Sequence, residues 1–80
     1  MEETEEAFNL DVLEAKAEAG DVEAQYEMGW RHALGMEVDL DDDVAVEWLE
    51  KAAAIGHMLA QNNMGARYYT GDGVEQNLKK

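Results

Sequence analysis

The sequence predicts an all-α protein in which antiparallel helix pairs stack into an α/α solenoid of about two 36-residue repeats, the last one incomplete. Three observations support this prediction. Apolar residues recur at helical spacing, short Gly-containing connections separate the helical stretches, and the chain matches itself after a shift of 36 positions. The matched residues are mostly small or apolar: Gly20 and Gly56, Ala24 and Ala60, Gln25 and Gln61, Met28 and Met64, Gly29 and Gly65, Arg31 and Arg67, Gly35 and Gly71, Val38 and Val74. Such a pattern is typical of a packing unit that is stacked repeatedly.

The first helix is expected over about residues 4–19, where Leu10, Leu13 and Ala17 share one face. Acidic residues near its start suit the positive end of the helix dipole. Gly20 is expected to end the helix in a left-handed conformation.

The second helix is expected to begin after Asp21, a plausible N-cap, and to end at Leu34 before Gly35. Gly29 in its middle costs about 1 kcal/mol relative to Ala. The same residue type recurs at Gly65, so we expect close helix packing at both glycines.

The third helix is expected from the acidic run 41–43 to Gly56, and the fourth from about Met58 to Thr70. The apolar stripe of the third helix is formed by Ala45, Trp48, Leu49 and Ala52. We therefore divide the chain, residues 1–80, as a single repeat domain: a helix of a degenerate first repeat (1–20), one repeat (21–56) and a partial repeat (57–80).

The residue pattern closely resembles the Sel-one-like repeat, a member of the tetratricopeptide-like solenoids. The resemblance rests on Val38, Asp41, Ala45, Trp48, Lys51, Ala52, Ala53, Gly56, Ala60, Met64, Gly65, Tyr68, Gly71, Gly73 and Val74. It implies an adaptor that holds other proteins together without catalysis of its own. Glu37 replaces the second Gly of the family's G-x-G-V turn, so we expect that turn to be reshaped, because positive φ is costly for Glu.

In related solenoids the first helix of each pair lines a concave groove, which gives the candidate binding face. The candidate partner-binding residues are Glu23, Tyr26, Trp30, Asn62, Ala66 and Tyr69, with Ala33 and Leu59 on the same two helix faces. Trp30 has two interpretations. It anchors a basic or amphipathic peptide beside carboxylates, or it packs against the first helix and covers the open end of the array.

Three other patterns admit chemical interpretations, and each has a structural alternative. The run Asp39-Leu40-Asp41-Asp42-Asp43 imitates a calcium loop, but Val44 stands where the sharp turn requires Gly, and helix capping explains the same carboxylates. His32 and His57 have no metal-ligand spacing; we interpret His32 as a packing residue and His57 as solvated. Gly71-Asp72-Gly73 is interpreted as a turn because no Lys-Ser/Thr follows it.

Composition narrows the function further. The 80 residues include 19 Asp and Glu, 6 Lys and Arg, and no Cys or Ser, giving a net charge of −13. The charge argues against binding nucleic acid or an anionic membrane. The missing Cys and Ser exclude thiolate sites and a serine-hydrolase constellation built from this chain. The acidic N-terminus and the lack of a long apolar run predict a cytoplasmic protein.

We therefore predict a non-catalytic protein–protein interaction module that binds a partner peptide or protein, basic partners included, in a concave groove, and we expect neither a cofactor nor a metal centre. Two alternatives stay open. One is an acidic regulatory domain that binds divalent cations. The other is a self-associating fragment whose homodimer covers apolar surface on Trp48 and Ala52.

Overall fold

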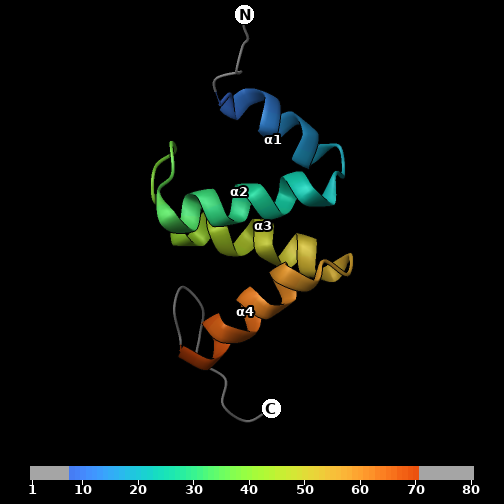
Figure 1. Cartoon of the computed structure of the whole chain (residues 1–80), viewed down its shortest axis with the longest axis vertical. Helices are drawn as coiled ribbons and strands as arrows, with labels where there is room; N and C mark the ends of the chain where they lie inside the picture. Colours follow the sequence, from blue (N-terminus) through green and yellow to red (C-terminus); the bar gives the residue numbers. More distant parts are fainter. Residues whose placement is uncertain (1–7, 71–80) are drawn as a thin grey trace, which may run out of the picture.

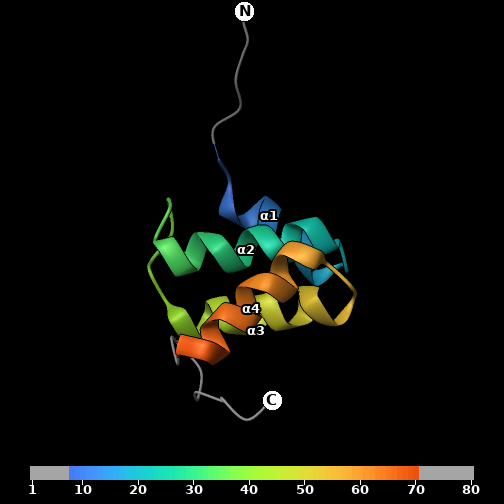
Figure 2. The ribbon, with the colours of Figure 1, turned by 60° about the horizontal axis from the view of Figure 1, so that its bottom comes forward.

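A computed structural model of the chain describes residues 8–70, and it consists of four consecutive helices (Figure 1). They are α1 (Leu10–Glu18), α2 (Val22–Leu34), α3 (Asp42–Ala54) and α4 (Met58–Thr70). The helices follow one another along the long axis, and turning the molecule shows α4 lying in front of α3 (Figure 2). The predicted all-α class is confirmed. No helix within residues 8–70 has the length and apolar character to cross a membrane.

The first helix begins later than the sequence predicts. Asn9 is extended, and its side-chain Oδ1 accepts a hydrogen bond from the Val12 amide at 3.2 Å. Phe8 and Asn9 are therefore outside the helix, and the predicted continuous helix over 4–19 is wrong at its N-terminal part; residues 4–7 lie outside the described range. The physical reason is that an Asn side chain competes for backbone amides and stops the helix from extending backwards.

The predicted N-cap at Asp21 is confirmed, and Asp41 plays the same part for the next helix. Oδ1 of Asp21 accepts from the Ala24 amide at 3.2 Å, and Oδ1 of Asp41 accepts from the Val44 amide at 3.1 Å. Each carboxylate satisfies one of the amides that a helix start leaves unpaired. The caps fix where α2 and α3 begin, and hence which residues face their neighbours.

The two repeated glutamines tie each helix pair to the preceding one. Gln25 Nε2 donates to the Ala17 carbonyl at 3.1 Å, and Gln61 Nε2 donates to the Ala53 carbonyl at 3.0 Å. Both acceptors lie near the C-terminal end of the previous helix, where carbonyls lack helical partners. The recurrence of Gln in the repeat thus has a structural cause.

Helix α2 packs through two opposite faces. Ala24 and Met28 face α1 in one buried cluster with Leu13 and Ala17, whereas Val22 and Tyr26 pack on a second cluster formed by α3 and α4. The second cluster is built on Leu49, Ala52, Ala60 and Met64. Burial on both faces explains why α2 carries small and apolar residues on two stripes.

Close packing at Gly29 is confirmed, whereas close packing at Gly65 is not. A Cβ added at Gly29 would lie 2.5 Å from Cγ and Cδ2 of Leu49, which is fully buried. A Cβ added at Gly65 would have no described atom within 4 Å. The expectation for Gly65 is therefore wrong for residues 8–70, because no described helix covers that side of α4.

The apolar surface expected on α3 for self-association is covered. Ala52 is fully buried, and Trp48 packs against the cluster between α1 and α2. Helix α4 supplies the cover for Ala52, because Ala60 and Met64 share its cluster. The predicted location of exposed apolar surface is thus wrong; large exposed apolar side chains lie instead at Leu34, Leu40, Ile55, Met58, Leu59 and Tyr69.

The connection between α2 and α3 contains a second residue with positive φ besides Gly35, and that residue is not a glycine. Glu37 adopts φ of +66°, in the left-handed region that favours glycine. The Glu37 carboxylate accepts a hydrogen bond from Nη1 of Arg31 at 3.1 Å, and the same nitrogen donates to the Met36 carbonyl at 3.1 Å. These contacts offset the steric cost of positive φ for a residue with a Cβ.

Candidate partner-binding groove

A groove of about 580 Å³ separates α2 from α4 on one side of the molecule. Side chains from α2, from the α2–α3 connection, from the start of α3 and from α4 line it. They are Tyr26, Trp30, Ala33, Leu34, Leu40, Asp42, Asn63 and Arg67. The groove therefore combines aromatic and aliphatic side chains with a carboxylate, an amide and a guanidinium, so its surface is mixed in polarity.

The α2 wall of the groove follows from helical spacing. Tyr26, Trp30 and Ala33 lie four and three residues apart, so they project from one face. The ring of Trp30 is half-buried, and the Arg31 guanidinium carbon lies 4.8 Å from its centroid. This cation–π contact restricts the ring while leaving part of it exposed in the groove.

The α4 wall is polar. Arg67 Nε donates to Asn63 Oδ1 at 3.0 Å, and Arg67 Nη1 lies 3.8 Å from Asp42 Oδ1 at the start of α3. The Arg67 side chain is 10% exposed. The contacts with Asn63 and Asp42 hold the Arg67 guanidinium in place, so it is a fixed polar group in the α4 wall of the groove.

The structure brings two of the six sequence-predicted site residues together in the groove. Tyr26 and Trp30 line it, whereas Glu23 lies at the far end of α2 beside His57. The three candidates on α4 lie elsewhere: Asn62 and Tyr69 are exposed on the side of α4 away from α3, and Ala66 borders a separate hollow of about 300 Å³.

The geometry of stacking explains this difference. The repeat places equivalent residues on the same face of α2 and α4, but a groove between two helices needs opposite faces. Asn63 and Arg67, which line the α4 wall, match Glu27 and Arg31 after the shift of 36 positions. Sequence reasoning missed them, although the recurring Arg was a usable signal.

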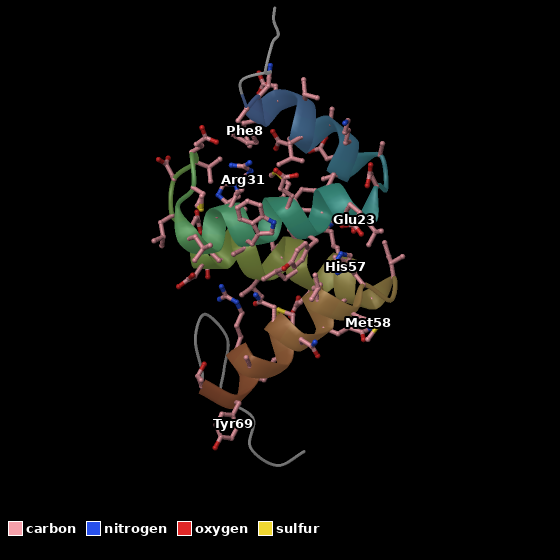
Figure 3. The ribbon with its side chains drawn as sticks, viewed as in Figure 1. Phe8, Glu23, Arg31, His57, Met58 and Tyr69 are labelled. Atoms are coloured by element: carbon pink, nitrogen blue, oxygen red, sulfur yellow. The ribbon has the colours of Figure 1, made fainter. Side chains whose placement is uncertain are left out.

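His57 lies packed between helices, which corrects the expectation that it is solvated. Its side chain is 7% exposed, and its ring stacks on Tyr26 with 4.5 Å between centroids. Nδ1 accepts from the Ala60 amide at 3.1 Å and so caps α4, and Nε2 lies 3.3 Å from the Glu23 carboxylate (Figure 3). The imidazole therefore joins the start of α2 to the start of α4.

The acidic run and the other candidate motifs do not assemble a chemical site in the described part of the chain. Asp41 caps α3, Asp42 faces Arg67, and His32 Nδ1 lies 3.0 Å from the Asp39 carbonyl. Within residues 8–70 no three His, Cys, Asp or Glu side chains gather as metal ligands would. The turn interpretation of Gly71-Asp72-Gly73 concerns residues outside the described range.

Tyr68 and Glu50 join α4 to α3 outside the groove, and their pairing predicts a pH effect. The hydroxyl of Tyr68 donates to Glu50 Oε2 at 3.1 Å. This hydrogen bond, together with the negative charge of Glu50, raises the pKa of Tyr68 above 10.0. The contact stabilises the fold below pH 10.0 and is lost as the pH rises through the raised pKa. Both groups are exposed, so the expected loss is about 0.5 kcal/mol or less.

We expect Glu50→Gln to lower the pKa of Tyr68, because the negative charge of Glu50 disfavours the tyrosinate and the substitution removes that charge. An NMR titration of the Tyr68 ring in both proteins measures the shift. A Tyr68 pKa that is equal in the two proteins would contradict the assigned cause.

Comparisons with known proteins agree with the helical repeat fold. The family model for the Sel1 repeat matches residues 22–57 and 59–80. The chain is 39% identical to the protective antigen c5321 of uropathogenic Escherichia coli, which displays an SLR fold, with a TM-score of 0.82 over 89% of this chain and 15% of that one. It is 38% identical to a Sel1 repeat protein from Oxalobacter formigenes, with a TM-score of 0.78 over 85% of this chain and 51% of that one. The comparison with curated proteins gives no match.

These likenesses confirm the predicted α/α solenoid and the repeat-family resemblance. The chain spans 15% of the first structure's length and 51% of the second's.

Proposed function

The chain belongs to the Sel1 repeat family, whose members generally act as scaffolds for protein–protein interaction, and we propose that it binds a peptide segment of a partner protein in the groove between α2 and α4. The observation that carries this proposal is the partly buried Trp30 in the lining of a groove of about 580 Å³. Trp and Tyr dominate the binding energy of many interfaces, because each buries a large rigid surface.

The surroundings of the groove favour a partner segment with an apolar side chain next to Lys or Arg. Leu34 and Leu40 are each 65% exposed at one end of the groove and offer apolar contact. The run of residues 39–43 around Leu40 carries four Asp. A carboxylate-rich rim attracts cationic segments and raises their association rate.

The function is tested by titrating basic amphipathic peptides into the protein and into Trp30→Ala. We expect Trp30→Ala to weaken binding about thirtyfold, the effect of losing an anchor residue worth about 2 kcal/mol. Isothermal calorimetry gives the dissociation constants, and circular dichroism checks that the variant remains folded. Trp30→Phe should retain most of the affinity.

Leu59→Ala serves as the matched control, because Leu59 is 57% exposed and does not line the groove. This variant should bind the peptides as the wild type does. Equal affinity of folded Trp30→Ala and wild type would contradict the groove assignment.

A further inference from the structure

The N-terminus of α4 is capped by a different chemical group from the other described helices. A side-chain oxygen caps each of the first three, supplied by Asn9, Asp21 and Asp41. An imidazole nitrogen of His57 caps α4. His57 occupies the position of Asp21 after the shift of 36 residues, and the two capped amides, Ala24 and Ala60, are equivalent as well. The repeat therefore replaces a carboxylate by a group that gains a proton near neutral pH.

The contacts of His57 determine which ring nitrogen carries the proton. Nδ1 lies 3.1 Å from the Ala60 amide nitrogen, and because a backbone amide only donates, Nδ1 is unprotonated and accepts. The proton of the neutral ring is then on Nε2, which lies 3.3 Å from Oε1 of Glu23 and donates to it. Figure 3 shows His57 between Glu23 and Met58. Both ring nitrogens are thus engaged in the neutral state, one with each helix.

A second proton adds at Nδ1, and there it reverses the contact with α4. The protonated nitrogen and the Ala60 amide would face each other as two donors, so the hydrogen bond that caps the helix is lost. The positive charge would also lie at the N-terminus of α4, where the helix dipole is itself positive. Both effects weaken the start of α4.

The same proton strengthens the contacts of the ring with α2. The Glu23 carboxylate would pair with a cation, although it is 78% exposed and solvent screens the attraction. The Tyr26 ring, stacked with 4.5 Å between centroids, also attracts a charged imidazole. The hollow of about 420 Å³ beside the imidazole is otherwise lined by uncharged residues, Val22, Ile55, Gly56, Met58 and Leu59. The protonated ring therefore stays against α2 and gives up α4.

We propose that His57 is a pH-sensitive link between the two helix pairs, in which protonation of the imidazole keeps its contacts with α2 and releases the first turn of α4. This turn contains Ala60, which is fully buried in one cluster with Leu49 and Ala52. Its release loosens one end of that cluster, while Met64 continues to hold α4 further along. The effect is confined to α4, because carboxylic acids as a class are ionised above about pH 5 and keep accepting from their amides.

Solution NMR of the full chain at about pH 8 and about pH 5, the range over which imidazole changes its charge, tests this link. At the higher pH the ring 15N shifts of His57 should report an unprotonated Nδ1 and a protonated Nε2. At the lower pH both nitrogens should be protonated, and the 13Cα shifts of residues 58–60 should move towards random-coil values. The protection of the Ala60 amide, relative to an unstructured chain at the same pH, should fall about fivefold, the effect of losing one hydrogen bond.

Two variants and an internal reference assign the response. His57→Asn supplies a cap that does not titrate, of the kind that Asn9 provides for α1, so residues 58–60 should stay helical at both pH values. Glu23→Gln is the matched control, since it removes the carboxylate of α2 and leaves the cap of α4, and it should retain the response. Residues 22–24, which Asp21 caps, should not change in the same spectra. Circular dichroism checks that both variants remain folded.

Four outcomes would overturn the proposal. They are a proton on Nδ1 at about pH 8, unchanged 13Cα shifts of residues 58–60 once the ring is protonated, the same response in His57→Asn as in the wild type, and an equal response at residues 22–24. The last two would assign the pH effect to groups other than His57. None of these measurements involves a bound peptide, so their outcome is independent of the proposed groove.

Discussion

Replacing Gly29 by Ala is expected to lower the free energy of unfolding by about 2 kcal/mol, because the new methyl group overpacks the α2–α3 interface. The added Cβ would lie 2.5 Å from two carbon atoms of Leu49 and 3.4 Å from the Ala45 carbonyl oxygen. Leu49 is fully buried, so it has no open space into which its side chain can turn. The clash outweighs the gain of about 1 kcal/mol in helix propensity that Ala offers over Gly.

Gly65→Ala is the matched control in the other repeat, and its expected effect has the opposite sign. No described atom crowds this position, so Ala should raise the free energy of unfolding by about 0.5–1 kcal/mol through propensity alone. Urea unfolding followed by circular dichroism measures both variants. If the two substitutions changed stability in the same direction, the distinct packing assigned to the two glycines would be wrong.

The elements that the sequence predicts well are those set by local chemistry. The N-cap Asp21, the terminating Gly35 and the start of the fourth helix at Met58 follow from interactions within a few residues, and the structure agrees with each. The repeat adds non-local information, because equivalent residues occupy equivalent places in the stack. It therefore predicts that α2 contributes Tyr26 and Trp30 to a groove.

The features that the sequence does not predict depend on which other helix packs against a given helix face. The 36-residue repeat predicts that Asn62 occupies the same position on α4 as Tyr26 does on α2. It does not predict whether another helix packs against that position. The burial of His57 has the same origin, since its partners Glu23 and Tyr26 are more than 30 positions away in the chain. The late start of α1 has a different cause, because Asn9 is a local signal that the acidic residues before it obscured.

Arg31 connects more parts of the molecule than its place on the surface of α2 suggests. Its guanidinium carbon lies 3.8 Å from the centroid of the Phe8 ring, and Nε donates to the Glu27 carboxylate at 2.8 Å (Figure 3). Nη1 bonds both the Met36 carbonyl and Glu37 at 3.1 Å. One side chain therefore holds the segment before α1, the body of α2 and the turn that leads to α3.

Arg31→Ala is expected to lower the free energy of unfolding by about 2 kcal/mol. Each ion pair alone contributes little, because the carboxylates of Glu27 and Glu37 are 35% and 63% exposed and can be rehydrated. The larger loss comes from the cation–π contact with Phe8 and from the Met36 carbonyl, which loses its charged donor while Glu37 keeps its unfavourable positive φ.

Comparison with Glu37→Ala and Arg31→Lys separates these contributions. Glu37→Ala removes one exposed ion pair and should cost at most about 1 kcal/mol. Arg31→Lys keeps the positive charge but loses the planar guanidinium with its several N–H donors. We therefore expect it to recover less than half of the stability lost in Arg31→Ala. A double-mutant cycle with Phe8→Ala should give a coupling of about 0.5–1 kcal/mol, measured by chemical denaturation. If Arg31→Ala cost no more than Glu37→Ala, the stabilising role assigned to the guanidinium would be refuted, since the ion pair alone would then account for it.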